Sequence, residues 1–452
     1  MSLVGGLACG HDAVAFGAPL CTHLQTCQQS GLSCVRWYLG VGLEMEVLCV
    51  PCADQRQTGS AVTATRVCEP CFLHAFNEVA DMVGVRGEPG VITREAPFAT
   101  ALTITALPVE LGPISDLAPI STASGSVWML LSASGALIRF DADTGMWSAV
   151  AECSVPAEPD HEPWCGRALR RRLHVSPCGK FAAVVNDYGR WGQILDLGSG
   201  RVTMDLDGGD YHPETVPFSL AFFQVRNRTI VIHRSAWNRL DLSDPESGEL
   251  LSVRDTPGYG QGENPPPHYL DYFHGALIVD PTGTRVVDDG WIWHPVGVPV
   301  VFRLARWHGE NVWESDDGPS RLDLCARDSW DDAIAWLDDH RVAVAGIGDD
   351  DAAMVPGARI FDVTRRGKAA PGWSPHADEL LVFAGPSGLF FSEGGWLFAS
   401  NDTGLSRWDP TTGERTGHLS GFRPTYHHRG TRELVQLVDH NLVRLAIVPG
   451  DW

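Results

Sequence analysis

The stretch 138–145, Ile-Arg-Phe-Asp-Ala-Asp-Thr-Gly, is an apolar run that ends in an aromatic residue and an aspartate and continues into a turn with a glycine. Related stretches return at residues 194–200, 240–248, 360–363 and 407–413. Asp141 and Asp196 are 55 residues apart, and Asp362 and Asp409 are 47 residues apart. Short apolar runs that are separated by glycine turns at a repeated spacing predict an all-β repeat architecture.

A second element precedes these stretches: an apolar run, a turn with the pattern Pro-x-Gly, and another apolar run. It is clearest at residues 175–184 and 279–287, and it is typical of a hairpin between two strands. With both elements, residues 98–452 resemble WD-repeat β-propellers, in which four-stranded blades of about 40–50 residues form a ring. The resemblance implies a mainly β fold with degenerate repeats.

The third strand of each blade can be counted along the chain. Six candidates lie near residues 139, 194, 240, 302, 360 and 407, and a seventh is the segment 441–448. We therefore predict a seven-bladed β-propeller, with six or eight blades as the alternatives. Residues 101–107 would supply the outer strand of the last blade, because closing the ring removes the exposed edge of an incomplete sheet.

Cysteines are concentrated at the start of the chain, where eight of the 12 lie within the first 71 residues. Two Cys-x-x-Cys pairs, Cys49 with Cys52 and Cys68 with Cys71, are separated by 15 residues. This spacing is typical of a tetrahedral zinc site, because each pair presents two thiolates on one side of a turn. Zinc is the predicted cofactor, and its role would be structural, since about 70 residues build only a small core.

Two Cys-x-His pairs lie further upstream, Cys9 with His11 and Cys21 with His23. They offer the ligands of a second zinc site of the Cys2His2 type. The four pairs fit either two successive sites or a cross-braced zinc finger. Cys27 and Cys34 could replace one or two of these ligands, and disulfides are the alternative to metal binding.

Residues 72–83 carry apolar side chains at helical spacing, and Gly84 is a stop signal. One helix directly after the second Cys-x-x-Cys pair is the treble-clef pattern. We predict a zinc-binding module with one helix at residues 1–83, a Gly/Pro linker at 84–97 and the propeller at 98–452. The chain is rich in Arg and has only two lysines, and in this it resembles bacterial proteins, among which uncharacterised propellers carry Cys/His-rich heads.

Charge and hydropathy limit the partners. The chain has 34 basic and 56 acidic residues, which gives a net charge of −22. This charge argues against nucleic acid as a partner and permits a basic protein or peptide. A membrane helix needs about 20 apolar residues in a row. The sequence has no such run, and its first 20 residues have no Lys or Arg that would mark a secretory signal, so we expect a cytoplasmic protein that does not bind membranes.

Loops that enter the predicted blades, and loops after their second strands, are rich in aromatic, acidic and His residues. In the propeller register these loops share one face, and aromatic residues dominate protein-binding hot spots. The predicted partner-binding residues are Trp191, His212, Tyr272, Trp293 and Trp330.

Three functions compete, and the least supported is a RING-like zinc module that recruits a conjugating enzyme, which only the spacing of the Cys pairs favours. The first is a non-catalytic protein-interaction scaffold, in which this face binds a protein or peptide and the zinc module is structural or docks a second partner. The sequence lacks the G-x-S-x-G, H-E-x-x-H and P-loop patterns, which favours the scaffold and leaves no predicted catalytic residue. The alternative is a hydrolase or lyase with an axial site, in which His212 or His274 would act with Asp210 or Asp271.

Overall fold

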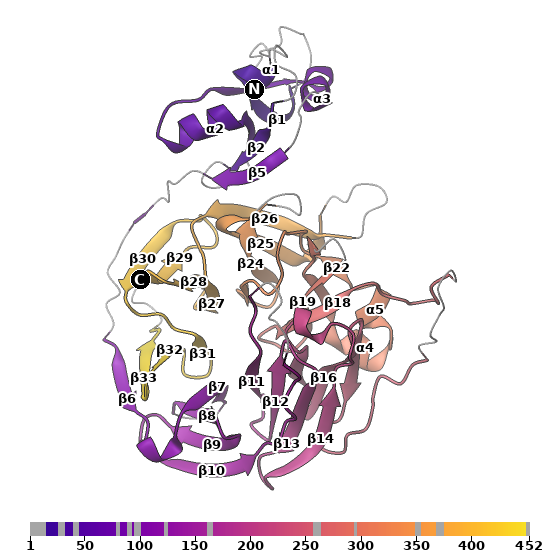
Figure 1. Ribbon diagram of the computed structural model, residues 1–452, viewed down its shortest axis with the longest axis vertical. Helices are drawn as coiled ribbons and strands as arrows, with labels where there is room; N and C mark the ends of the chain where they lie inside the picture. Colours follow the sequence, from indigo (N-terminus) through magenta and orange to yellow (C-terminus); the bar gives the residue numbers. More distant parts are fainter. Residues whose placement is uncertain are drawn as a thin grey trace.

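The fold is mainly β in the computed structural model (Figure 1). The structure describes residues 15–25, 32–38, 45–77, 82–87, 93–94, 101–121, 125–160, 166–255, 264–292, 296–348, 354–367 and 375–448. No helix within these ranges is long and apolar enough to cross a membrane.

The N-terminal module contains a five-stranded sheet in the order β4-β1-β3-β2-β5. β1 runs parallel to β3, β2 runs parallel to β5, and β4 runs antiparallel to β1. Buried side chains that include Leu20, Trp37 and Leu48 form its core. The strands are β1 (Ala15–Cys21), β2 (Cys34–Tyr38), β3 (Met45–Cys49), β4 (Ala64–Cys68) and β5 (Met82–Gly87), and the helices are α1 (Thr22–Gln25), α2 (Val50–Gln57) and α3 (Glu69–Asn77).

The helix predicted at 72–83 is correct only in its first part. α3 covers Glu69–Asn77, and Met82–Gly87 form strand β5, so Gly84 lies inside a strand and does not end a helix. The described module also has three helices instead of one. The sheet runs past residue 83, because β5 pairs with β2 from Cys34 to Tyr38.

The rest of the described chain forms a ring of antiparallel sheets, and the first strands β7, β11, β27 and β31 lie toward its middle in Figure 1. From β7 to β27 the first strand of each sheet contacts that of the next, and β31 of the last sheet contacts β7 of the first. Sheets of this kind around a common axis form a β-propeller-type fold.

Seven sheets make up this part of the described chain, and they are numbered here in chain order. The first holds β7 (Ile114–Ile120), β8 (Val127–Ser132), β9 (Ala136–Asp141) and β10 (Trp147–Glu152); the second holds β11 (Arg170–Val175), β12 (Phe181–Asp187), β13 (Trp191–Asp196) and β14 (Arg201–Asp207); the third holds β15 (Leu220–Val225), β16 (Arg228–Ala236) and β17 (Arg239–Ser243). The fourth holds β18 (Phe273–Val279), β19 (Arg285–Ile292), β20 (Val296–Gly297), β21 (Val300–Arg303) and β22 (Leu322–Asp323), with α4 (Leu304–Gly309) and α5 (Glu314–Asp317) before β22. The fifth holds β23 (Ile334–Trp336), β24 (Arg341–Ile347), β25 (Val355–Arg366) and β26 (Ala377–Ala384); the sixth holds β27 (Leu389–Glu393), β28 (Trp396–Asn401), β29 (Gly404–Trp408) and β30 (Arg415–Ser420); the seventh holds β31 (Tyr426–His428), β32 (Glu433–Val438), β33 (Asn441–Ala446) and β6 (Thr103–Ala106).

The apolar core lies between neighbouring sheets. One cluster joins Leu131 of the first sheet to Val184 of the second, and another joins Trp128 of the first sheet to Val435 and Leu442 of the seventh. Successive side chains of a strand point to opposite faces of its sheet, and each face packs against one neighbouring sheet. Every sheet therefore has an apolar layer on both faces. This packing holds the sheets together around the ring.

The glycine turn that carries the sequence repeat has one conformation throughout. Gly145 donates its backbone N–H to the carbonyl of Asp141 at 2.8 Å, and its φ of 74° lies in the left-handed region that favours glycine. The same bond joins Gly200 to Asp196 and Gly413 to Asp409. In the third sheet the turn begins at Asp244 and not at the expected Asp241, because Gly248 bonds to the carbonyl of Asp244.

The last sheet takes its outer strand from the beginning of the ring. β6 pairs antiparallel with β33, from Asn441 opposite Ala106 to Arg444 opposite Thr103. Arg444 donates to the hydroxyl of Thr105 at 3.3 Å, and Leu107 is 3% exposed in the core that joins the seventh and first sheets. These contacts make β6 a part of both the last sheet and its interface.

We expect removal of residues 1–97 to leave a folded ring and removal of residues 1–110 to destabilise it. The longer deletion removes β6 and Leu107, and burial of one leucine side chain contributes about 1.5–3 kcal/mol before the exposed edge of β33 is counted. Among the described residues, the contacts with the ring that the shorter deletion removes are the bridge between Thr93 and Arg415 and the approach of β5 to β25. Thermal unfolding of the two truncated proteins tests this, and equal midpoints would contradict it.

Candidate functional site

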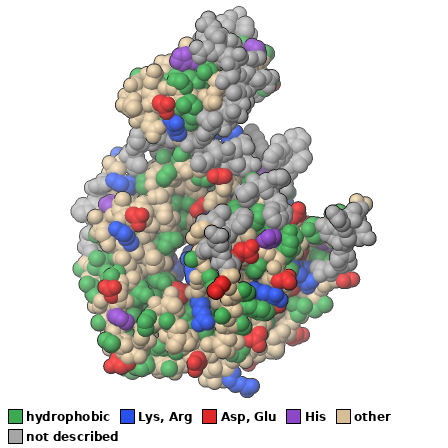
Figure 2. Space-filling view, viewed as in Figure 1, with side chains coloured by type: hydrophobic (Ala, Val, Ile, Leu, Met, Phe, Trp, Pro, Cys, Tyr) green, Lys and Arg blue, Asp and Glu red, His purple; other side chains and the backbone are tan. Residues whose placement is uncertain are grey.

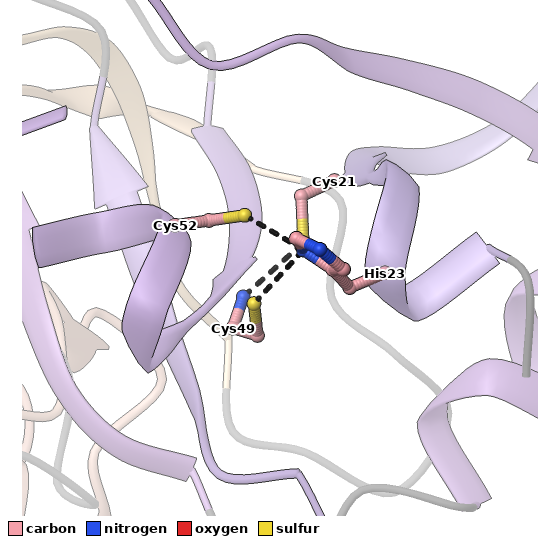
Figure 3. Close-up of side chains that lie close together, drawn as sticks. All are labelled: Cys21, His23, Cys49 and Cys52. Atoms are coloured by element: carbon pink, nitrogen blue, oxygen red, sulfur yellow. Dashed lines mark hydrogen bonds between the residues drawn. The ribbon is translucent and has the colours of Figure 1, made fainter. Parts of the chain in front are cut away.

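Four side chains of the N-terminal module meet in one cluster: Cys21, His23, Cys49 and Cys52 (Figure 3). Their ligand atoms all lie within 4.8 Å of one another. His23 Nδ1 is 3.1 Å from Cys52 Sγ and 3.6 Å from Cys49 Sγ, and the backbone N–H of Cys49 donates to Cys21 Sγ at 3.3 Å. The three cysteines are buried, and His23 is exposed at the rim of the cluster.

Parallel pairing of β1 with β3 brings these residues together. The carboxyl ends of parallel strands lie at the same edge of a sheet, and each of these two strands is followed by a helix. Cys21 ends β1 and His23 lies in α1, while Cys49 ends β3 and Cys52 lies in the first turn of α2. Two strand-to-helix junctions therefore present their ligands to the same space.

The cluster could bind a metal ion, and its chemistry and spacing fit one. Zinc binds thiolates at about 2.3 Å and imidazole nitrogen at about 2.0–2.1 Å in a tetrahedral site, which sets neighbouring ligand atoms roughly 3.5–3.8 Å apart. The 3.6 Å between His23 Nδ1 and Cys49 Sγ matches these values, and the 3.1 Å between His23 Nδ1 and Cys52 Sγ is about half an ångström shorter. Burial raises the pKa of Cys49 and of Cys52 in the protein without metal, so a bound cation would supply the charge that stabilises their thiolates.

The predicted site of Cys49, Cys52, Cys68 and Cys71 is wrong as a single set. β4 runs antiparallel to β1, so Cys68 lies opposite Ala15 at the start of β1, whereas Cys21 at its end lies opposite Ala64. Six residues of strand separate the two ends of β1, which is about 20 Å. Cys68 therefore lies too far from the cluster to share its ion, and Cys71 is not among the four residues whose ligand atoms gather there.

Cys9, His11 and Cys27 lie outside the described residues. Cys34 lies opposite Cys49 in the β2–β3 pair and is buried. Burial is the main cause that raises the pKa of the Cys34 thiol to about 12, and the neighbouring Cys21 and Cys49 add to it. Cys34 therefore lies beside the four clustered ligands without being one of the group.

The middle of the ring holds a second feature, a recess of about 660 Å³ that we call the axial recess. Its lining comes from β7, β11, β18, β27 and β31 and from the segment before β23, so six sheets contribute to it. Basic and acidic side chains lie close together around the middle of the ring in Figure 2. The charged residues of the lining are Asp116, Arg170, Arg171, Arg172, Asp289, Asp331 and Asp332.

Sequence reasoning missed the three consecutive arginines of β11. Arg170 and Arg172 both donate to Asp187, at 3.1 and 2.6 Å, and the Asp187 side chain is fully buried. Arg171 lies between them and reaches the carbonyl of Val155 at 3.4 Å. The run of arginines could have predicted a charged lining of the recess, because the innermost strand of a blade faces the axis.

A buried ion pair supports the recess from behind. Arg327 donates to Asp289 at 2.6 Å, and both side chains are at most 1% exposed. Arg327 also donates to the carbonyl of Ala345 at 3.3 Å, so it joins the fourth sheet to the fifth. Burial is the main cause that raises the pKa of Asp289 to about 6, and Arg327 opposes the shift.

Two of the predicted partner-binding residues reach the surface. His212 is exposed, adopts a left-handed conformation with a φ of 46° and lies 3.1 Å from Glu214. Trp191 is half-buried at the start of β13 with the guanidinium of Arg190 4.5 Å from its ring centroid. Trp293 lies outside the described residues.

Tyr272 and Trp330 are buried, which corrects their predicted role in a partner-binding surface. The Tyr272 hydroxyl donates to the carbonyl of Val298 at 2.9 Å. The Trp330 ring stacks on Trp291 at 4.7 Å, and its Nε1 donates to the carbonyl of Thr215 at 2.8 Å. Both side chains therefore join loops and sheets to one another and present little surface to a partner.

The contacts seen for the two histidines of the enzyme alternative are with other acidic residues. His274 lies 2.6 Å from Asp288, not beside Asp271, and both side chains of the observed pair are fully buried. His212 pairs with Glu214, and Arg190 approaches Asp210 at 4.0 Å. The His274–Asp288 pair joins two neighbouring strands, β18 and β19, whereas His212 and Glu214 lie between β14 and β15.

No protein-family model and no curated protein matches the chain. Among solved structures, a chain of "Crystal Structure of Mitotic Checkpoint Complex" is similar, with 14% identity and a TM-score of 0.44 over 79% of this chain and 96% of that chain. BamB from Moraxella catarrhalis is similar with 15% identity and a TM-score of 0.43 over 74% of this chain and 85% of that chain. The fold assignment rests on the sheets described above and not on these likenesses.

Proposed function

We propose that this chain is a protein-interaction scaffold. In this proposal the seven sheets are the blades of one propeller closed by β6, and the axial recess binds a segment of a partner protein. The N-terminal module, which we extend from residue 83 to Gly87, is stabilised by one zinc ion on Cys21, His23, Cys49 and Cys52. We also propose a cytoplasmic location.

The observation that carries the proposal is the convergence of unlike charges from four of the six sheets that line one recess. Arg171 and Asp332 are examples that come from the second and the fifth sheet and line the same space. A lining with both signs favours a polar peptide segment, whose own charges and backbone groups can pair with it. The net charge of −22 would attract a partner with a basic surface.

Trp191 and His212 extend this proposed contact face. Trp191 begins β13, directly after the turn that leaves the second strand of its sheet, and His212 lies in the loop that leads to the third sheet. These two loops are in contact in the structure, since Tyr188 in the turn before Trp191 donates its backbone N–H to the carbonyl of Val216 at 3.2 Å. A partner segment in the recess would pass near both residues.

Reversing one charge of the recess should weaken partner capture. Asp332 is exposed in the recess, and we expect Asp332→Arg to lower capture of a co-purifying partner at least tenfold, because a like charge would face the basic groups of that partner. Asp339→Arg is the matched control, since Asp339 is also exposed but lies in the turn at the other end of β23. Quantitative pull-down with both variants measures the effect, and equal loss in both would overturn the proposal.

A further inference from the structure

A separate cavity of about 560 Å³ lies on the flank of the ring, between the third and fourth sheets. It is formed by the turn between β16 and β17, by the segment 266–270 and by residues around α5. The last two parts lie outside the four-strand repeat. The cavity is lined by Ser235, Ala236, Trp237, Asn238, Arg239, Asp241, Pro266, Pro267, His268, Tyr269, Leu270, Trp313 and Asp316.

Aromatic rings form the walls of this flank cavity. Trp237 is half-buried and lies 5.3 Å from Tyr211 and 4.5 Å from Phe273, measured between ring centroids. Trp313 stacks on His268 at 4.5 Å, and the guanidinium of Arg254 lies 5.5 Å from the Trp313 centroid. The protein therefore already uses one of these rings to hold a guanidinium.

The two carboxylates of the lining differ in how far they are paired. Asp241 accepts hydrogen bonds from Ser235 and Ser252, from Arg239 through two nitrogens, and from Arg254 at 2.8 Å. Five bonds exceed the roughly four lone-pair positions of a carboxylate, so Asp241 has no capacity left for a ligand. Its function is to hold the end of β17 in place.

Asp316 is much less completely paired. Its side chain is 6% exposed, one nitrogen of Arg254 lies 3.3 and 3.4 Å from its two oxygens, and its other described contact is the hydroxyl of Ser315 at 3.2 Å. Burial raises the pKa of Asp316, and Arg254 opposes the shift. A buried carboxylate with acceptor positions to spare lines a cavity of aromatic rings, and such a carboxylate gains most from a charged donor.

We propose that the flank cavity binds an arginine side chain of a partner, with its guanidinium on Asp316 and among the rings of Trp237, Tyr269 and Trp313. The planar guanidinium suits both groups, because it pairs with a carboxylate and stacks on aromatic faces. The surrounding charges favour a cation over a neutral ligand. Asp241, Asp316 and Asp317 outnumber Arg239 and Arg254, and Asp317 lies 2.8 Å from His268 at the rim. This site is distinct from the axial recess and does not depend on it.

Three short peptides test the proposal on the full-length protein by isothermal titration calorimetry. They are Ac-Gly-Gly-Xaa-Gly-Gly-NH₂ with arginine, lysine or citrulline at the centre. Citrulline keeps the shape of arginine without its charge. We expect the arginine peptide to bind, the lysine peptide to bind several-fold more weakly, and the citrulline peptide to bind at least tenfold more weakly than the arginine peptide.

Two variants locate the binding. Asp316→Asn removes the charge of the carboxylate, and Leu270→Trp fills the cavity from its loop without touching a buried charge. We expect each to weaken binding of the arginine peptide at least tenfold, while the control Asp339→Asn leaves it unchanged. If Asp316→Asn fails to fold, Leu270→Trp alone decides the location.

Several results would overturn the proposal. They are equal affinity for the arginine and citrulline peptides, no binding of the arginine peptide up to millimolar concentration, and full binding by Leu270→Trp. Tighter binding of a neutral disaccharide such as maltose than of the arginine peptide would also overturn it. None of these results bears on partner capture at Asp332, so failure here and failure of the scaffold proposal are distinguishable.

Discussion

Replacing Cys49 with serine is expected to lower the zinc content of the purified protein by about one equivalent and to unfold the N-terminal module. Cys49 ends β3 and starts α2, and its thiol lies among the other three ligands of the cluster. Structural zinc in finger peptides contributes an apparent binding free energy of about 10–16 kcal/mol, which in such small modules is folding free energy. The loss of one thiolate from a four-ligand site should therefore leave the sheet of β1 to β5 without its main support.

Metal analysis and limited proteolysis measure this effect. Cys178→Ser is the control, because Cys178 is an exposed thiol of the propeller outside the cluster, and this variant should keep the zinc content and the cleavage pattern of the unchanged protein. Cys21→Ser should behave as Cys49→Ser does. Wild-type zinc content in both cluster variants would show that the ion is held elsewhere.

Replacing Arg327 with methionine is expected to destabilise the propeller by about 3–5 kcal/mol, the cost of leaving one partner of a buried ion pair uncompensated. Arg327 and Asp289 are both fully or almost fully buried, and Arg327 is the only cation within hydrogen-bond distance of Asp289 in the described chain. The double variant Arg327→Met with Asp289→Asn should recover much of the loss, since it removes both charges.

The destabilisation should depend on pH in a defined direction. The pKa of Asp289 in the folded protein, about 6, lies above the value of about 3.9 that an unfolded chain shows. Folding therefore favours its protonated form, and this carboxyl lowers the free energy of unfolding as pH rises from about 4 through about 6. Loss of Arg327 raises its pKa further. Urea unfolding should give a larger difference between Arg327→Met and the unchanged protein at pH 8 than at pH 5, and an equal difference at both would contradict the assignment.

The strand pattern could be predicted because its signals are local. The glycine turn after Asp141 is visible in the sequence, and the structure gives it the same backbone hydrogen bond in four sheets. The weak strand near residue 302 is β21, third in the order of its sheet. The predicted start of the turn in the third sheet was wrong, because two aspartates three residues apart, Asp241 and Asp244, both precede Gly248. Only burial separates them: Asp241 is held by two arginines, and Asp244 begins the turn.

The ligand grouping could not be predicted from spacing alone. Spacing along the chain suggests that Cys49 and Cys52 share a site with the next Cys-x-x-Cys pair. In the folded sheet, the direction of each strand decides which strand ends lie together. Parallel β1 and β3 bring Cys21 to Cys49, and antiparallel β4 carries Cys68 to the opposite end of the sheet. Such pairing directions involve contacts between distant segments, which leave little trace in the composition of either strand.

The prediction that aromatic loop residues bind a partner failed for a related reason. Trp330 lies in a loop, and loops usually run over the surface. Here Trp291 and Trp330 stack on each other, and Phe273 stacks on Trp291 at 4.4 Å, so the loop packs its tryptophan inward. A tryptophan offers the same signal whether it anchors a partner or a neighbouring blade.

The pairing of β6 with β33 sets a waiting time during protein synthesis. Residues 103–106 leave the ribosome early, and their partner strand at 441–446 is made more than 300 residues later. At roughly 5–20 residues per second this takes about 15–70 seconds. For that time β6 has no native neighbour in its sheet, and the ring cannot close. Ribosome stalling or slow translation in the last sheet would lengthen the interval in which this early strand is open to chaperones, proteases and the strands of other nascent chains.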